Sequence, residues 1–203
     1  ETDWQDSADY DIDDDVPFEL TATLAENVSA YKTYKLVFHD TLSAGLSYNN
    51  DFKVTFNGQD VTSYFTPAYE GTTLTFTCNN VKDFGATNES VIKVDYSAKL
   101  NENAVIGATG NPNEVYLEFS NNPNSNGEGE TGNTPKDTVI VFTYKVVVNK
   151  VDEKGASLKG AGFTLYKKLA DGSQKEISYV EINDDQTTVF TFKGLDDGDY
   201  VLK

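Results

Sequence analysis

The stretch VPFELTATL, residues 16–24, sets a pattern that much of the chain repeats. Its apolar side chains stand at every second position, which is the period of a β-strand with one buried face. The same alternation recurs in residues 34–38, 74–76 and 92–98, and turn-forming residues such as those at 43–45 separate the runs. No stretch has a convincing helical period. The pattern predicts an all-β protein built from antiparallel, Ig-like β-sandwiches.

The composition excludes several classes of partner and site. The chain has 203 residues and a net charge of −17, and all 16 of its cationic side chains are lysines. Such an acidic surface repels nucleic-acid phosphates and anionic lipid, so neither is an expected partner. One cysteine and one histidine exclude an intramolecular disulfide, a cysteine-based zinc cluster and a multi-histidine metal site. No cofactor or metal is expected.

No apolar run approaches the roughly 20 residues that a membrane-spanning helix needs. The first 17 residues also lack the basic start and apolar core of a signal peptide. The acidic run at residues 11–15 has the carboxylates of a calcium loop but neither its glycine nor its distal glutamate, so a solvated loop is the preferred interpretation.

The domain organisation follows from a change in composition. Residues 121–135 (NNPNSNGEGETGNTP) contain almost nothing that could be buried and predict a long exposed loop. Residues 138–148 then form a strand long enough to leave one domain and enter the next. We therefore expect two tandem sandwiches, residues 1–143 and residues 144–203.

The second of these units carries a family resemblance. VNKVDEKGASLKGAGFTLYKK (residues 148–168) and FKGLDDGDYVLK (residues 192–203) resemble the collagen-adhesin B-type domain of Gram-positive surface proteins and pilins. The resemblance implies that Lys150 is the nucleophile of an internal isopeptide bond. In the family, the closing strand continues into a glutamate-containing box and later an asparagine. Both would lie beyond Lys203, so a C-terminally truncated copy is expected.

The first unit resembles the fimbrial isopeptide-forming domain of backbone pilins, which is similar to a collagen-adhesin A-type sandwich. The resemblance rests on residues 16–24, on YKLVFHDTLSAGLSYN (residues 34–49) and on VYLEFSNNPN (residues 115–124). It implies a covalent amide between a lysine on the first strand and an asparagine on the last strand, beside an acidic residue. No lysine precedes Lys32, so either the partner lysine lies upstream of Glu1, which is the preferred expectation, or this copy of the domain has lost the bond.

These three residue types suit the chemistry. Burial disfavours the charged form of a lysine and leaves a nucleophilic amine. A carboxyl that the same apolar surroundings keep protonated can donate a hydrogen bond to the asparagine carbonyl as the amine adds. Ammonia then leaves, and the product is a crosslink made once without turnover.

Strand parity selects candidates in the first unit. Asp40 shares a strand face with Phe38, and Asn121 shares one with Phe119, so both side chains are predicted to point inward. Asp40 is then the isopeptide-promoting acid and Asn121 the crosslinked amide. The alternative interpretation is that Asp40 caps the turn that follows it and Asn121 merely starts the loop after its strand.

The resemblance implies a structural function. The chain is expected to be a shaft subunit of a sortase-assembled pilus, attached to the cell wall outside the cell. Its partners would be other pilin subunits in a covalent polymer, and sortase through segments absent from this stretch. The alternative is a surface adhesin or stalk whose loops bind a host glycan or protein. An enzyme is not expected, because no catalytic constellation for turnover stands out.

Overall fold

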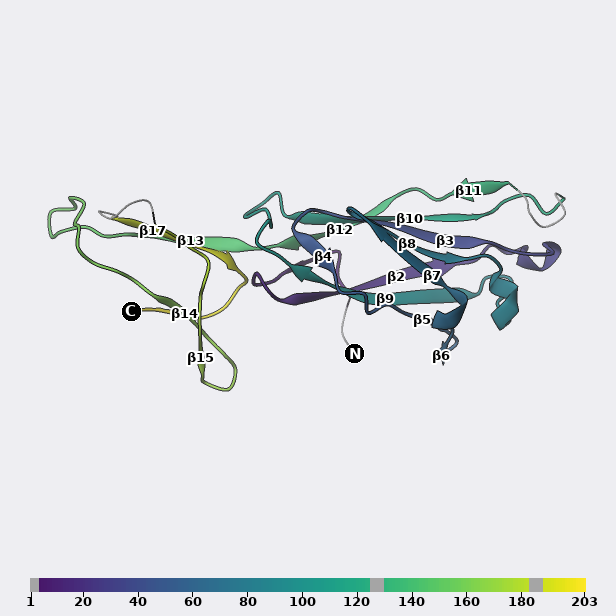
Figure 1. Ribbon diagram of the computed structural model, residues 1–203, viewed down its shortest axis with the longest axis horizontal. Helices are drawn as coiled ribbons and strands as arrows, with labels where there is room; N and C mark the ends of the chain where they lie inside the picture. Colours follow the sequence, from purple (N-terminus) through teal and green to yellow (C-terminus); the bar gives the residue numbers. More distant parts are fainter. Residues whose placement is uncertain (1–3, 125–129, 183–187) are drawn as a thin grey trace.

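The computed structural model describes residues 4–124, 130–182 and 188–203. The described chain forms two β-sandwiches that lie end to end along the long axis of the molecule (Figure 1). Short 3-10 turns, η1 (Val28–Ala30), η2 (Thr62–Tyr64) and η3 (Val81–Phe84), provide the helical structure of the described residues. None of the described helices is long and apolar enough to cross a membrane. The all-β prediction is confirmed.

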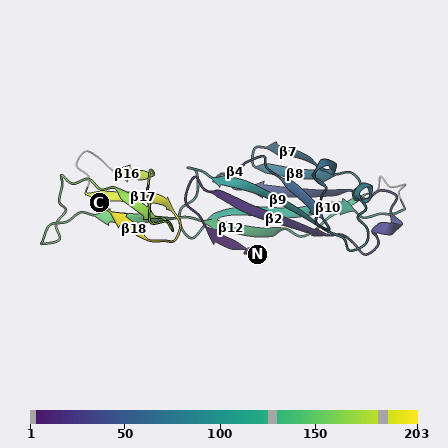
Figure 2. The ribbon, with the colours of Figure 1, turned by 90° about the horizontal axis from the view of Figure 1, so that it is seen from below.

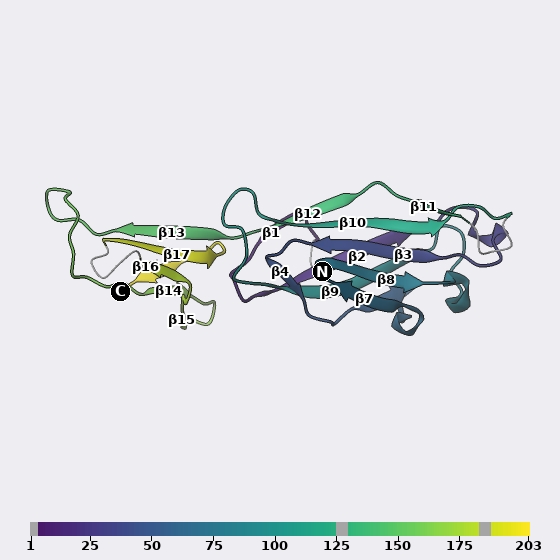
Figure 3. The same ribbon diagram turned by 45° about the horizontal axis from the view of Figure 1, so that its top comes forward.

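The first sandwich packs two sheets against each other, as the turned view of Figure 3 shows. One sheet has seven strands in the order β1-β12-β10-β3-β8-β7, with β11 paired to β10, and the other has five in the order β2-β9-β5-β6, with β4 paired to β9. Its strands are β1 (Ser7–Asp9), β2 (Asp15–Thr23), β3 (Leu36–Leu42), β4 (Leu46–Tyr48), β5 (Lys53–Phe56), β6 (Gln59–Asp60), β7 (Thr66–Glu70), β8 (Thr73–Cys78), β9 (Val91–Leu100), β10 (Asn111–Ser120), β11 (Thr131–Asn133) and β12 (Asp137–Phe142).

The pairing is antiparallel throughout this sandwich except at one edge, where β1 runs parallel to β12. The strand β11 lies within the stretch predicted to be an exposed loop, and its residues pair with the end of β10. That part of the loop prediction is therefore wrong, because backbone pairing needs no apolar side chains. Residues 125–129 of the same stretch lie outside the described residues.

The second sandwich is smaller and has two three-stranded sheets, in the orders β13-β17-β16 and β15-β14-β18 (Figure 2). Its strands are β13 (Tyr144–Asn149), β14 (Leu165–Lys168), β15 (Gln174–Glu176), β16 (Val180–Ile182), β17 (Val189–Leu195) and β18 (Tyr200–Leu202). Its core consists of five buried side chains, Leu165, Ile177, Phe190, Phe192 and Leu195. The core of the first sandwich is several times larger.

The predicted connecting strand is present as two strands in line, β12 and β13, separated only by Thr143. Thr143 is fully buried and its hydroxyl donates a hydrogen bond to the carbonyl of Leu195 at 3.3 Å. Beside it, the backbone of Ile12 donates to the carbonyl of Gly194 at 3.0 Å. Gly194 has a φ of 77°, and a Cβ there would lie 2.4 Å from Ile12 Cδ1, so only glycine fits.

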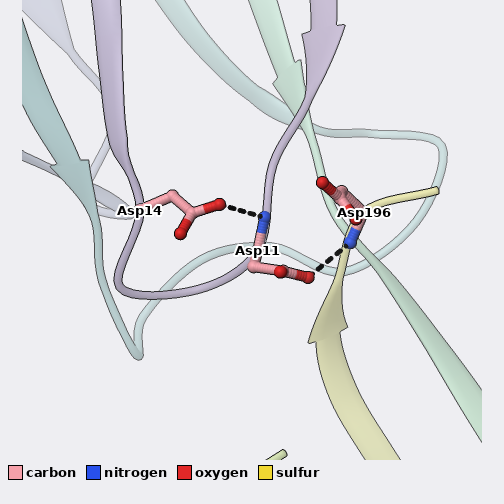
Figure 4. Close-up of side chains that lie close together, drawn as sticks. All are labelled: Asp11, Asp14 and Asp196. Atoms are coloured by element: carbon pink, nitrogen blue, oxygen red, sulfur yellow. Dashed lines mark hydrogen bonds between the residues drawn. The ribbon is translucent and has the colours of Figure 1, made fainter. Parts of the chain in front are cut away.

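Charged side chains complete this joint (Figure 4). Asp11, Asp14 and Asp196 bring carboxylate oxygens within 4.8 Å of one another. The ammonium of Lys167 lies 2.8 Å from Asp11 Oδ2 and also pairs with Asp196, while the Asp196 backbone donates to Asp11 Oδ1 at 2.9 Å. Asp11 is only 5% exposed, so the prediction of a solvated loop is wrong for this residue. The contact with the second sandwich buries it, and Lys167 supplies the positive charge.

We predict that Lys167→Gln loosens the joint, because the clustered carboxylates then repel one another without a counter-charge. The joint should lose about 2 kcal/mol, between the values for exposed and buried ion pairs. Spin labels at Thr72 and Glu153, both exposed, report the distance between the sandwiches. The distance distribution should broaden in Lys167→Gln and stay narrow in Lys168→Gln, which changes the exposed neighbour. Equal widths in both variants would contradict the prediction.

Candidate functional site

Asp40 lies in the core of the first sandwich. It is on β3 with its side chain on the same face as Phe38 and Leu42, and all three are at most 1% exposed. Strand parity predicts this inward orientation. The side chain does not cap the following turn from the surface. A carboxyl group so deep among apolar side chains requires polar partners, because desolvation of an unpaired carboxylate is costly.

Two side chains from different strands provide those partners. Tyr96 comes from β9 in the opposite sheet and is 4% exposed, and Asn113 comes from β10, next to β3, and is 3% exposed. The Tyr96 hydroxyl donates a hydrogen bond to Asp40 Oδ2. Asn113 Nδ2 donates to the Tyr96 hydroxyl at 2.7 Å and lies 3.5 Å from Asp40 Oδ2. Asp40, Tyr96 and Asn113 are called the buried polar triad below.

Two of the five polar side-chain atoms of this triad have no hydrogen-bond partner among the described residues. They are Asp40 Oδ1 and Asn113 Oδ1, and both are buried. Buried polar atoms are paired in the great majority of folded proteins, and an unpaired one costs roughly 1–3 kcal/mol. Two unpaired oxygens on neighbouring side chains therefore indicate that a further donor belongs at this position.

The surroundings favour the protonated forms of the acidic groups. Burial raises the pKa of Asp40 to about 6, and the hydrogen bonds from Tyr96 and Asn113 offset part of that shift. Burial and the charge of Asp40 raise the pKa of Tyr96 well above its ordinary value. The Tyr96 ring stacks on Phe18, with ring centres 5.2 Å apart, and meets the edge of Tyr48 at 5.7 Å. The Tyr96 member of the triad is thus packed between aromatic rings.

A cavity of about 570 Å³ leads to this position. It lies between β2, at the edge of the smaller sheet, and the edge of the larger sheet, and Asn113 forms part of its wall. Apolar side chains from both sheets line it, among them Val16, Phe18, Leu20, Phe38, Val115, Val139 and Val141. No lysine of the described chain lines it; Lys35 and Lys93 instead form ion pairs with Glu118 and Glu19 at 2.7 and 2.9 Å.

Asn121 does not join the triad, and its predicted inward orientation is wrong. The residue is exposed and follows the last residue of β10, where its backbone donates to Glu130. Asp40 is paired across the sheet with Val115. Asn121 is six residues further along, about 20 Å away at 3.4 Å per residue. The prediction from strand parity failed here because β10 ends at Ser120, and side chains beyond the end of a strand no longer alternate between inward and outward positions.

The residues that sequence reasoning missed had usable signals. Asn113 has the same parity as Val115, so the argument applied to Asn121 applies equally to it. Tyr96 has the same parity as Val94 and was counted with the apolar core. In both cases the missing information was the register between strands, which brings Asn113 to within two residues of the partner of Asp40.

Lys150 lies just beyond the end of β13 in the second sandwich. Its side chain is partly buried, and its backbone N–H donates to the carbonyl of Thr188 at 2.8 Å. Among the described residues, no carboxylate forms an ion pair with its ammonium group. The structure therefore leaves the predicted role of Lys150 untested.

Comparison with known proteins gives matches to both parts of the chain. Residues 12–123 match the family described as Gram-positive pilin backbone subunit 2, Cna-B-like domain. Residues 144–203 match the SpaA family, a prealbumin-like fold domain. The trypsin-resistant surface T6 protein of Streptococcus pyogenes serotype M6 is 29% identical over 207 residues, which cover 92% of this chain and 36% of that protein.

Solved structures share the fold. The T6 backbone pilin of serotype M6 Streptococcus pyogenes superposes with a TM-score of 0.73 at 22% identity, over 96% of this chain and 44% of that one. The major pilin SpaD of Corynebacterium diphtheriae gives 0.68 at 22% identity, over 97% and 52%. BcpA, the major pilin subunit of Bacillus cereus, gives 0.65 at 18% identity, over 97% and 55%. The chain thus spans about half the length of these structures.

We predict that Asp40→Asn raises the unfolding free energy of the first sandwich, relative to that of the wild type, more at high pH than at low pH. Well below the ordinary carboxyl pKa of about 4, the side chain is protonated in both the folded and the unfolded chain, and its burial adds no pH-dependent cost. As the pH rises from there to the folded-state pKa of about 6, the unfolded chain ionises while the folded carboxyl stays protonated, so the wild type loses stability over this range and loses no more above it. The shift corresponds to about 3 kcal/mol. The unfolding free energy of Asp40→Asn minus that of the wild type should increase by this amount between about pH 3 and about pH 8.

Urea unfolding at the two pH values measures this difference. Asp137→Asn, which changes an exposed carboxylate at the start of β12, is the matched control and should show little of the effect. A pH-independent difference for Asp40→Asn would contradict the assignment of Asp40 as a buried carboxyl with a raised pKa.

Proposed function

The chain belongs to the Gram-positive backbone pilin family, and from that premise we propose that it forms part of the shaft of a cell-surface pilus, stabilised by internal Lys–Asn isopeptide bonds. The observation that carries the proposal is the buried polar triad with its two unpaired oxygens, Asp40 Oδ1 and Asn113 Oδ1. A lysine amine placed between them would supply the missing donor. It would also place a nucleophile beside the Asn113 carboxamide.

The crosslinking reaction is a single condensation. The lysine Nζ adds to Cγ of Asn113, the bond from Cγ to Nδ2 breaks, and Nδ2 leaves as ammonia. Asp40 acts as the proton-bearing carboxyl, for which its raised pKa suits it. We propose Asn113 in place of Asn121, because Asn113 Nδ2 is within 3.5 Å of Asp40 whereas Asn121 is exposed.

The lysine is proposed to come from polypeptide that precedes Glu1. The supporting feature is the apolar cavity that ends at Asn113 and that no lysine of the described chain enters. Within the described part of the chain, β2 pairs only with β9, so its other edge beside this cavity is open. A strand placed there would pair with β2 and could direct one lysine inward to Asn113, while its other inward side chains cover the apolar walls.

The second unit, proposed as residues 144–203, would form its own bond through Lys150 with an acid and an asparagine beyond Lys203. Both reactions consume their own nucleophile, so we propose no turnover on any substrate. The proposed partners are further pilin subunits in a covalent polymer and the sortase that joins them. The proposed location is the cell wall-attached pilus.

A covalent bond across the core suits a protein under tension. Like a disulfide, it restricts the unfolded chain and stabilises the fold by a few kcal/mol, but it also resists reducing agents. The segment between its two ends cannot extend under force. A shaft of sandwiches joined end to end, as in Figure 1, would then transmit load without lengthening.

We predict that the full-length protein weighs one ammonia less than its sequence for each bond. Tandem mass spectrometry of a digest should find Asn113 joined to a lysine that precedes Glu1. Asn113→Ala and Asp40→Ala should each restore one ammonia, whereas Asn121→Ala should restore none. Loss of the crosslink in Asn121→Ala with its retention in Asn113→Ala would overturn the assignment.

We predict that Lys150→Ala restores one ammonia from the second unit alone. The first-unit crosslink should remain, since Lys150 contributes nothing to the buried polar triad. Lys154→Ala, which changes an exposed lysine in the following turn, is the matched control and should leave the mass deficit unchanged. An unchanged deficit in Lys150→Ala would exclude it as the nucleophile.

A further inference from the structure

The position of the Tyr96 hydroxyl bears on how ammonia leaves. An amide nitrogen is a poor leaving group until it receives a proton, so the crosslinking reaction needs an acid that contacts Asn113 Nδ2. Asp40 Oδ2 is 3.5 Å from this nitrogen, which is too long for efficient proton transfer. The Tyr96 oxygen is 2.7 Å from it and is hydrogen-bonded to Asp40 on its other side.

We propose that Tyr96 is a catalytic residue of the crosslinking reaction, whose hydroxyl relays a proton from Asp40 to the leaving nitrogen of Asn113. The inference rests on the proposed function, because it concerns the same reaction. It assigns a chemical role to a side chain that a β-sandwich core would otherwise contain only for packing.

The protons balance in this scheme. The lysine amine adds to Asn113 Cγ and gives one proton to Asp40 Oδ1, the oxygen that has no partner in the described chain. Addition makes Cγ tetrahedral and gives Nδ2 a free lone pair, so the two hydrogen bonds of the Tyr96 oxygen reverse their direction. Asp40 then gives the proton it carries on Oδ2 to the Tyr96 oxygen, and Tyr96 gives its own hydroxyl proton to Nδ2. The bond from Cγ to Nδ2 breaks and ammonia leaves. Asp40 and Tyr96 each end with the number of protons with which they began.

The environment of Tyr96 favours a role as a proton relay over a role as a general base. Burial and the neighbouring Asp40 raise its pKa, so the phenol stays neutral and can donate only while it accepts. The ring is fixed by the stacked Phe18 and by the edge of Tyr48. The hydroxyl is therefore held between the Asp40 carboxyl and the Asn113 carboxamide, and no side-chain rotation is needed before the proton transfer.

The test measures the rate of ammonia loss in the full-length protein. Pulse-labelled protein from cell-free synthesis is quenched in acid at timed intervals, and the crosslinked fraction is read from the intact mass. Tyr96→Phe keeps the ring and removes the hydroxyl, and it should slow the reaction at least about 10²-fold, the lower range of general acid catalysis. Tyr31→Phe removes the hydroxyl of another buried tyrosine, whose ring packs against Tyr34, and should react at the wild-type rate.

A second measurement leaves the hydroxyl and the packing intact. A relay moves two protons in the step that expels ammonia, so the wild-type rate in mixtures of H₂O and D₂O should fall along a curve, whereas a hydroxyl that only anchors Asn113 leaves one proton in transfer and gives a straight line. A straight line for the wild type, or a wild-type rate in Tyr96→Phe, would overturn the relay. Absence of ammonia loss from the wild type would instead overturn the crosslink itself, so the two failures are distinguishable.

Discussion

The burial of Asp40 is the constraint on which the first sandwich depends. A carboxyl group at 0% exposure needs partners that the apolar core does not contain, so Tyr96 and Asn113 must reach it from two other strands. Their hydrogen bonds leave one oxygen of Asp40 and one of Asn113 without a partner in the part of the chain that the structure describes. A core that only needed stability would replace all three by apolar side chains, because a half-satisfied polar network is less stable than an apolar one. The arrangement is therefore better explained by chemistry than by packing.

The sandwich architecture suits the proposed crosslinking reaction because it fixes three strands at once. β3 and β10 are neighbours in the larger sheet, so the register that pairs Asp40 with Val115 also sets the distance to Asn113. β9 lies in the opposite sheet and brings Tyr96 across the core. Displacing one strand by a single residue would turn its polar side chain out of the core. The long β9 and β10 strands, each of ten residues, hold that register through many backbone hydrogen bonds.

The fold and part of the site could be predicted from the sequence. Alternation along single strands predicted the β-sandwich class and the inward orientation of Asp40, because both depend on the local period of two. The same alternation was extended past the end of β10 and selected Asn121, which is exposed. Identifying Asn113 from the sequence requires knowing how β3 pairs with β10. Identifying Tyr96 requires knowing which strands of the two sheets face each other across the core. The ion pair of Asp11 with Lys167 joins residues 156 positions apart, and no local pattern reports it.

The two sandwiches differ in how much resistance to unfolding their core packing alone can provide. The second has five buried core side chains, and its strand β13 has exposed apolar residues such as Val146 and Val147. Tension that passes from β12 through Thr143 into β13 therefore enters the less stable unit directly. The contacts beside Thr143, including the Lys167 ion pairs, spread that load onto the loop between β17 and β18. The proposed shaft would gain little from reinforcing the first sandwich alone, which is a physical reason for the proposed second crosslink at Lys150.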